Sequence, residues 1–185
     1  MSGDKPSSMS NLDAFKTHLS RLVAQAEADE EIIITRSGRP LAKIEPRTKL
    51  PLTFLDTNIL VYAEDQSEQI KRERAVQLIL EHKRQRTGVV SLQVLQEFFT
   101  TVTKKYKLEP GIARYKVEFH SRFIVAEPTV NDILAAIDIH RFHGFSYWDA
   151  LILRMTKQTG CRVLLTEDMQ HGQVFDGVRI VNPFL

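Results

Sequence analysis

The chain has 185 residues, a mass of 21.2 kDa and a formal charge of +2 at pH 7. This length suits one ordinary domain with a small appendage. The low net charge argues against a histone-like electrostatic binder, and no apolar run approaches the roughly 20 residues of a membrane helix. Because the first residues lack a secretory signal and there is a single cysteine, Cys161, we expect a cytoplasmic protein with no membrane partner.

The segment before Leu50 has its own pattern. Residues 1–8 are polar and predict a disordered tail. Residues 32–35 and 40–44 predict a β-hairpin with Gly38 in its turn. Between the tail and the hairpin, apolar residues recur at helical spacing and predict one amphipathic helix: Leu12, Phe15, Leu19, Leu22, Val23 and Ala26. This small α+β module buries little apolar surface, so it should dimerise or pack on another surface.

From Leu50 onward, short apolar runs alternate with helical patterns. The predicted strands are residues 52–56, 89–90, 124–125, 163–166 and 178–181. The predicted helices are residues 68–85, the stretch from Ser91 to Val102, the stretch from Asn131 or Asp132 to His140, and residues 146–157. Such alternation favours an α/β fold with a mainly parallel sheet covered by helices on both faces.

Four acids stand where this architecture would bring them together. Asp56 ends the first strand, Glu97 lies in the helix after residues 89–90, Asp149 begins a helix, and Asp168 follows the strand 163–166. The carboxyl ends of parallel strands meet at one edge of a sheet. Carboxylates that converge without a partner repel one another, so the cluster implies a cation, and hard oxygen ligands favour Mg²⁺ or Mn²⁺.

Each acid also has a purely structural explanation when it is considered alone. Asp56 fits a cap of the following helix, Glu97 a solvated helix face, Asp149 a cap after Ser146, and Asp168 a turn. Three basic clusters are equally open to two interpretations, as solvated helix faces or as surfaces for a polyanion: Lys71, Arg72 and Arg74; Lys83, Arg84 and Arg86; and Lys104, Lys105 and Lys107.

Residues 51–185 resemble the PIN-domain nucleases, and most closely the VapC toxins. The resemblance lies in residues 55–58, 91–98, 146–151 and 165–169, which carry the four acids in order. It implies a three-layer α/β/α fold that cleaves RNA with Mg²⁺ or Mn²⁺ and forms a dimer or higher homo-oligomer. It assigns catalysis and metal binding to Asp56, Glu97, Asp149 and Asp168, and support of the site to Thr57, Asn58 and Thr166. Glu167 adjoins Asp168, which we assign by its position in the motif.

Residues 9–47 form a second module that resembles the amino-terminal domain of Phd/YefM antitoxins. The stretches that carry this resemblance are residues 14–22 and 31–44. It implies dimerisation and binding of operator DNA, with four basic residues against phosphate groups: Lys16, Arg21, Arg36 and Arg39. Only residues 45–51 separate Ile44, at the end of the predicted hairpin, from the next strand, too few for the toxin-binding helix of an antitoxin.

Three functional hypotheses follow. The first is a metal-dependent endoribonuclease, the toxin of a toxin–antitoxin system, with RNA as its substrate. The alternative is a DNA-binding autoregulatory protein that uses the PIN fold as an oligomerisation module, with restrained or absent nuclease activity. The third combines both, with the leading module restraining the nuclease through a basic side chain such as Arg39, Lys43 or Arg47.

Overall fold

The computed structural model describes residues 18–21, 32–36, 39–44 and 50–185. The chain divides after Lys49 into two compact units. In the first unit, residues 18–21 are helical, and strands β1 (Ile32–Arg36) and β2 (Arg39–Ile44) pair antiparallel, as the predicted hairpin requires. The predicted tail, most of the predicted first helix, Lys16 and Arg47 lie outside the described residues.

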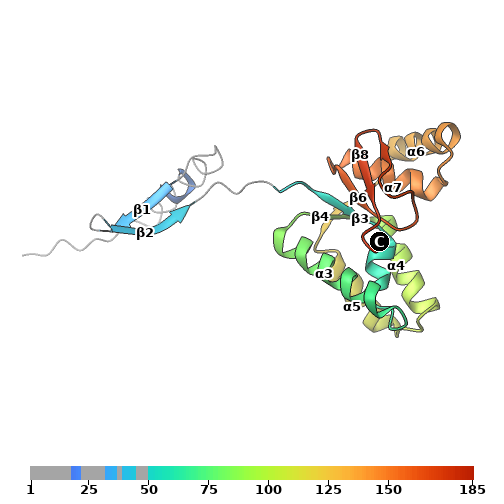
Figure 1. Cartoon of the computed structure of the whole chain (residues 1–185), viewed down its shortest axis with the longest axis horizontal. Helices are drawn as coiled ribbons and strands as arrows, with labels where there is room; N and C mark the ends of the chain where they lie inside the picture. The colour runs from blue at the N-terminus through green and yellow to red at the C-terminus, as the bar shows by residue number, and fades with distance from the viewer. Residues whose placement is uncertain (1–17, 22–31, 37–38, 45–49) are drawn as a thin grey trace, which may run out of the picture. The chain divides into compact units, whose positions relative to one another are not determined.

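The second unit is built on a six-stranded sheet with the strand order β5-β4-β3-β6-β8-β7 (Figure 1). Five strands are parallel and the short edge strand β7 is antiparallel to β8, which confirms the prediction of a mainly parallel sheet. The bounds are β3 (Thr53–Leu55), β4 (Gly88–Ser91), β5 (Ile124–Ala126), β6 (Val163–Leu165), β7 (Val174–Phe175) and β8 (Val178–Val181).

Helices flank this sheet, with α3, α4 and α5 on one side and α6 and α7 on the other (Figure 1). The bounds are α2 (Thr57–Tyr62), α3 (Gln69–Gln85), α4 (Leu92–Lys104), α5 (Pro110–His120), α6 (Val130–His143) and α7 (Tyr147–Gln158). Helix α5 and strand β7 were not predicted from the sequence. Within the described part of the chain, no helix has the length and apolar character needed to span a membrane.

Hydroxyl side chains set the starts of three helices. Ser91 Oγ accepts a hydrogen bond from Val94 N at the start of α4, and Ser146 caps α7, as predicted. Helix α6 begins earlier than predicted, because Thr129 is its N-cap and Asp132 completes a capping box with it. These caps fix where α4 and α7 leave the sheet edge, and therefore where their acids lie.

The order of the strands places a crevice beside β3. From β3 the chain proceeds outward to β4 and β5, and it then returns to pair β6 on the other side of β3. In open α/β sheets, ligands bind at the carboxyl ends of the strands where this reversal occurs. The central strands are anchored by side chains that are fully buried, including Phe54, Leu55 and Leu164. The crevice therefore has a rigid base.

A buried histidine lies away from this crevice, at the end of α5. His120 is 3% exposed and is surrounded by aromatic rings, at centroid distances of 5.0 Å from Phe98, 5.4 Å from Phe119 and 6.4 Å from Phe123. Its Nδ1 atom has no hydrogen-bond partner in the described residues. Burial, together with the charges of Lys83 and Lys116, lowers the pKa of His120 to about 3.

The buried, neutral His120 should make the stability of the chain depend on pH. The unfolded chain takes up a proton near pH 6.5 and the folded chain only near pH 3, so the stabilisation is complete above pH 6.5 and is lost as the pH falls between these values. The loss should approach about 1.4 kcal/mol per pH unit. Urea unfolding at pH 8, 6 and 5 measures it as the difference between the parent and His120→Phe, because the other titrating groups are common to both proteins. An equal slope in both proteins would refute this assignment.

Candidate metal centre

Asp56 is the buried acid of the crevice. Strand β3 ends at Leu55, and Asp56 is the N-cap of α2, with Oδ1 2.7 Å from Thr57 N. Its backbone N donates to Leu165 O at 3.0 Å, which ties it to β6. Asp56 therefore directly follows the strand and caps the helix, so the predicted capping role is present at the carboxyl end of β3.

Burial raises the pKa of Asp56 to about 7. The nearby carboxylates of Asp168 and Glu97 act in the same direction, whereas hydrogen bonds from Thr166 and from the backbone of Thr57 act against it. The three acids are therefore close enough to influence one another electrostatically. A positive charge at this point would offset both the burial and the repulsion.

The hydroxyl of Thr166 joins three parts of the crevice. Thr166 is fully buried, and its Oγ1 donates to Asp56 Oδ2 at 2.7 Å. The same oxygen accepts hydrogen bonds from Asn58 Nδ2 at 3.0 Å and from Asp168 N at 3.1 Å. Asn58 Nδ2 also donates to Asp168 Oδ2 at 2.9 Å. One donor and two acceptor positions are thus all used, which is the full capacity of a hydroxyl group.

Glu97 reaches the same edge from α4. Its Oε2 accepts a hydrogen bond from Thr57 Oγ1 at 2.7 Å, and its Oε1 accepts one from Gln93 Nε2 at 2.9 Å. Gln93 lies one turn earlier on α4 and is 7% exposed. Gln93 was not predicted from the sequence, although its spacing of four residues from Glu97 places both on one face of the helix.

Asp149 lies in the first turn of α7 and is held separately from the other acids. Its Oδ2 accepts a hydrogen bond from Ser146 Oγ at 2.7 Å, and Ser146 Oγ accepts one from Asp149 N. None of the hydrogen bonds of Asp149 reaches Asp56, Glu97 or Asp168 among the described residues. The structure thus links three of the four predicted acids through Thr57, Asn58 and Thr166, and leaves Asp149 at its own helix end.

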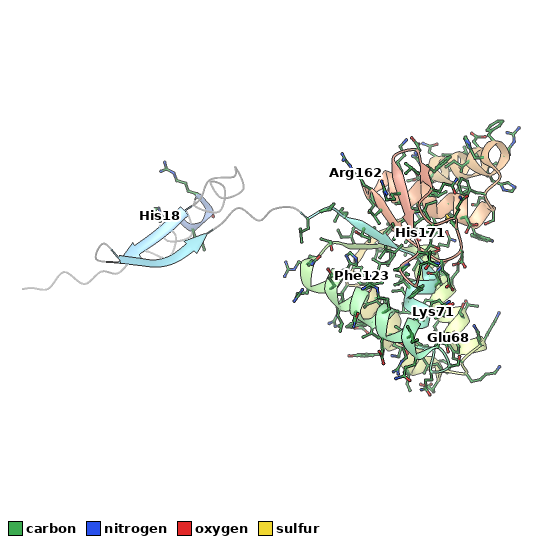
Figure 2. The ribbon with its side chains drawn as sticks, in the orientation of Figure 1. His18, Glu68, Lys71, Phe123, Arg162 and His171 are labelled. Carbon is green, nitrogen blue, oxygen red and sulfur yellow. The ribbon has the colours of Figure 1, made fainter. Side chains whose placement is uncertain are left out.

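The two neighbouring acids after β6 have different partners. Glu167 Oε2 forms an ion pair with Lys71 Nζ at 2.7 Å, and its Oε1 accepts a hydrogen bond from the Tyr62 hydroxyl. Lys71 extends from α3 (Figure 2) and also contacts Tyr62 Oη at 2.9 Å. Asp168, by contrast, is bound to Asn58 and, through Thr166, to Asp56. These contacts support the choice of Asp168 over Glu167 as the acid of the centre.

The donor atoms at this edge fit a hard divalent cation. They are carboxylate, hydroxyl and amide oxygens, which suit Mg²⁺ and Mn²⁺. Two buried amide oxygens, Asn58 Oδ1 and Gln93 Oε1, accept no hydrogen bond from any described residue. No three acids in residues 50–185 are grouped closely enough to hold an ion as they stand. Ligation by several acids therefore requires side-chain movement, for which the exposed Asp168 has room.

Comparison with known protein families gives two matches along the chain. The PIN domain family matches residues 53–174, which is more than half of the chain. The antitoxin Phd_YefM family of type II toxin–antitoxin systems matches residues 8–46. A comparison with curated proteins gave no match.

Solved structures resemble the second unit in fold. VapC20 of Mycobacterium tuberculosis, described as a sarcin–ricin loop cleaving toxin, has a TM-score of 0.53 and 16% identity, over 63% of this chain and 91% of its own. A DNA-bound VapBC of Salmonella typhimurium has a TM-score of 0.51 and 21% identity, over 71% and 97%. VapBC2 of Rickettsia felis, bound to a promoter DNA fragment, has a TM-score of 0.52 and 18% identity, over 70% and 96%. The family match over residues 53–174 shows that the chain belongs to the PIN domain family, and its residues 8–46 match the Phd_YefM antitoxin family.

Proposed function

We propose that this chain is a metal-dependent endoribonuclease, the toxin of a toxin–antitoxin system, with Asp56, Glu97, Asp149 and Asp168 as the acids that hold Mg²⁺ or Mn²⁺. The observation that carries the proposal is the set of hydrogen bonds that joins Asp56 to Asp168 through Thr166 and Asn58, and brings Glu97 to the same edge through Thr57. Membership of a family of nucleases supports the reaction class.

Each residue of the centre has a distinct part in the proposed reaction. A divalent cation bound there supplies charge neutralisation, polarisation of a phosphoryl oxygen and orientation of the attacking water. The fixed, buried carboxylate of Asp56 gives the centre its position, and Thr57, Asn58 and Thr166 orient the acids by hydrogen bonds. Asp168 and Asp149, at the ends of other elements, complete the oxygen ligands in this proposal.

The first unit supports a second function, in DNA binding. It matches an antitoxin family, and two structures similar in fold to the second unit are DNA-bound toxin–antitoxin complexes. Arg36 ends β1 and Arg39 begins β2, and they are Cα partners at the turn of the hairpin. Arg21 lies in the exposed helical stretch 18–21. We propose that these arginines and Lys16 contact the phosphates of operator DNA, and that the chain acts as a homo-oligomer.

Asp149→Asn should abolish cleavage without loss of the fold. The amide keeps the shape and the contact with Ser146 but removes the charge, so the rate of RNA cleavage in Mg²⁺ or Mn²⁺ should fall at least about 100-fold. Gel analysis of a mixed RNA, with and without EDTA, measures this. Asp138→Asn, at an exposed acid on α6, should cut at the rate of the parent. Cleavage by Asp149→Asn at the parental rate would refute the assignment.

A shortened chain that begins at Leu50 provides the control for restraint by the first unit. Faster cleavage by the shortened chain would show that the leading segment inhibits the centre. If neither length cleaves RNA with either metal, the nuclease proposal is wrong.

Thr166→Val should weaken both the fold and the binding of metal. The substitution leaves Asp56 Oδ2 buried without its hydroxyl donor, which should cost about 1–3 kcal/mol of unfolding free energy. It should also weaken Mn²⁺ binding about 10–100-fold, as measured by calorimetry. Thr156→Val is a matched control, because Thr156 is equally buried but donates only to Ile152 O within α7. Equal metal affinities in both variants would contradict the role of Thr166.

The combined substitution Arg36→Gln and Arg39→Gln should weaken binding to DNA from the chain's own promoter. Loss of two phosphate contacts should reduce affinity and make it less dependent on salt. A gel-shift titration at two salt concentrations measures both quantities. Arg162→Gln, an exposed arginine on the second unit, should bind like the parent. Binding by the parent at no more than salt-sensitive nonspecific levels would overturn this proposal.

A further inference from the structure

A hollow of about 470 Å³ opens directly beside the acids, within the range of roughly 300–1,000 Å³ that is usual for small-ligand sites. Glu97 and Asp168 line one part of it. The remaining wall includes two aromatic residues, Tyr62 and Tyr106, and one cation, Lys105. The proposed reaction gives no role to Tyr62, Tyr106 or Lys105, so the presence of these residues in the wall needs a separate explanation.

The two tyrosine rings are held in fixed positions. Tyr62 Oη contacts Lys71 Nζ at 2.9 Å and also donates to Glu167, and the ring lies edge-on to Phe184. Tyr106 Oη donates to Asp65 Oδ2 at 2.7 Å. Both side chains are half-buried, so each ring keeps some surface in the hollow while its hydroxyl is engaged. Rings whose orientation is already fixed lose little entropy when they bind a flat ligand.

The other wall of the hollow comes from the C-terminal half of α4 and its cap. Gln96, Thr100, Thr101 and the C-cap residue Lys105 all line the hollow, and their spacing pairs Gln96 with Thr100 and Thr101 with Lys105 on the helix surface. Lys105 Nζ lies 5.2 Å from the centroid of the Tyr106 ring. A positive charge, hydroxyl and amide groups and an aromatic ring therefore occur together. This combination suits a planar base that is linked to a phosphate.

We propose that this hollow binds the nucleotide adjoining the cleaved phosphodiester, with its base against the Tyr106 ring and its phosphate at Lys105. The inference rests on the proposed function, because it takes RNA as the substrate. Of the basic residues in the three clusters described above, Lys105 is the one that we assign as a contact with the RNA. Lys71 forms an ion pair with Glu167, Lys83 donates a hydrogen bond to the backbone oxygen of Phe119, and neither lines the hollow.

Binding of a fluorescent single-stranded RNA to the full-length chain tests this subsite, with Asp149→Asn in every protein so that the probe stays intact, and with Mg²⁺ present. Tyr106→Leu should weaken binding about tenfold, the usual effect of losing one base–aromatic stack. Tyr106→Phe loses the same hydrogen bond to Asp65 but keeps the ring, so it should bind like the parent. Lys105→Gln should weaken binding severalfold and reduce its salt dependence.

Two residues outside the hollow provide matched controls. Tyr115→Leu on α5, where Tyr115 is 65% exposed, and Lys104→Gln on α4 should leave the affinity unchanged. Three results would each overturn the subsite. The first is an equal loss of RNA affinity in Tyr106→Leu and Tyr106→Phe, and the second is an equal loss in Tyr106→Leu and Tyr115→Leu. The third is no binding of RNA by the parent. If the unsubstituted chain cuts RNA but Tyr106→Leu binds normally, the subsite is wrong and the nuclease proposal stands. A selective loss of binding in Tyr106→Leu, with no cleavage by either the unsubstituted chain or the chain that begins at Leu50, would support RNA binding in the hollow and refute the nuclease proposal.

Discussion

The structure of the second unit depends on the burial of one carboxylate, that of Asp56, at the end of a strand. Removing a charge from water costs several kcal/mol, and Asp56 is 5% exposed. The hydroxyl of Thr166 and the backbone N–H of Thr57 offset part of this cost. The register of β3 and β6, which pairs Leu55 with Leu165, places Asp56 and Thr166 side by side as the next residues. A one-residue shift in the pairing of β3 and β6 would separate these two side chains. The register of the strands therefore determines the geometry of the candidate metal centre as well as that of the sheet.

Much of the fold follows from pattern because its central strands are short and apolar and most of their residues are buried. Runs such as residues 52–56 and 163–166 predicted β3 and β6 to within a residue or two. Helix α5 was not predicted because only Ala113 and His120 are buried in it, so its sequence has no strong apolar stripe. Strand β7 has two residues and depends on its pairing with β8, which no local pattern shows.

For the centre, the sequence identified the acids but not how they are connected. Asp56 and Asp168 follow strands, so topology alone brings them to one edge. Whether Glu167 or Asp168 forms hydrogen bonds with Asn58 and Thr166 depends on the turn after β6, and residue type could not decide it. The roles of Gln93 and Tyr106 likewise come from elements that pack together at a distance in the chain, so they required coordinates.

Three consecutive residues at the start of α2 each hold a different part of the candidate metal centre. Asp56 contributes the buried carboxylate, Thr57 holds the acid from α4, and Asn58 holds the acid that follows β6. The spacing between acids is thus set by the first turn of one helix rather than by the loops that carry them. For protein engineering, this means that changing the length of the side chain at position 57 or 58 would widen or narrow the distance between the acids without substituting any acid.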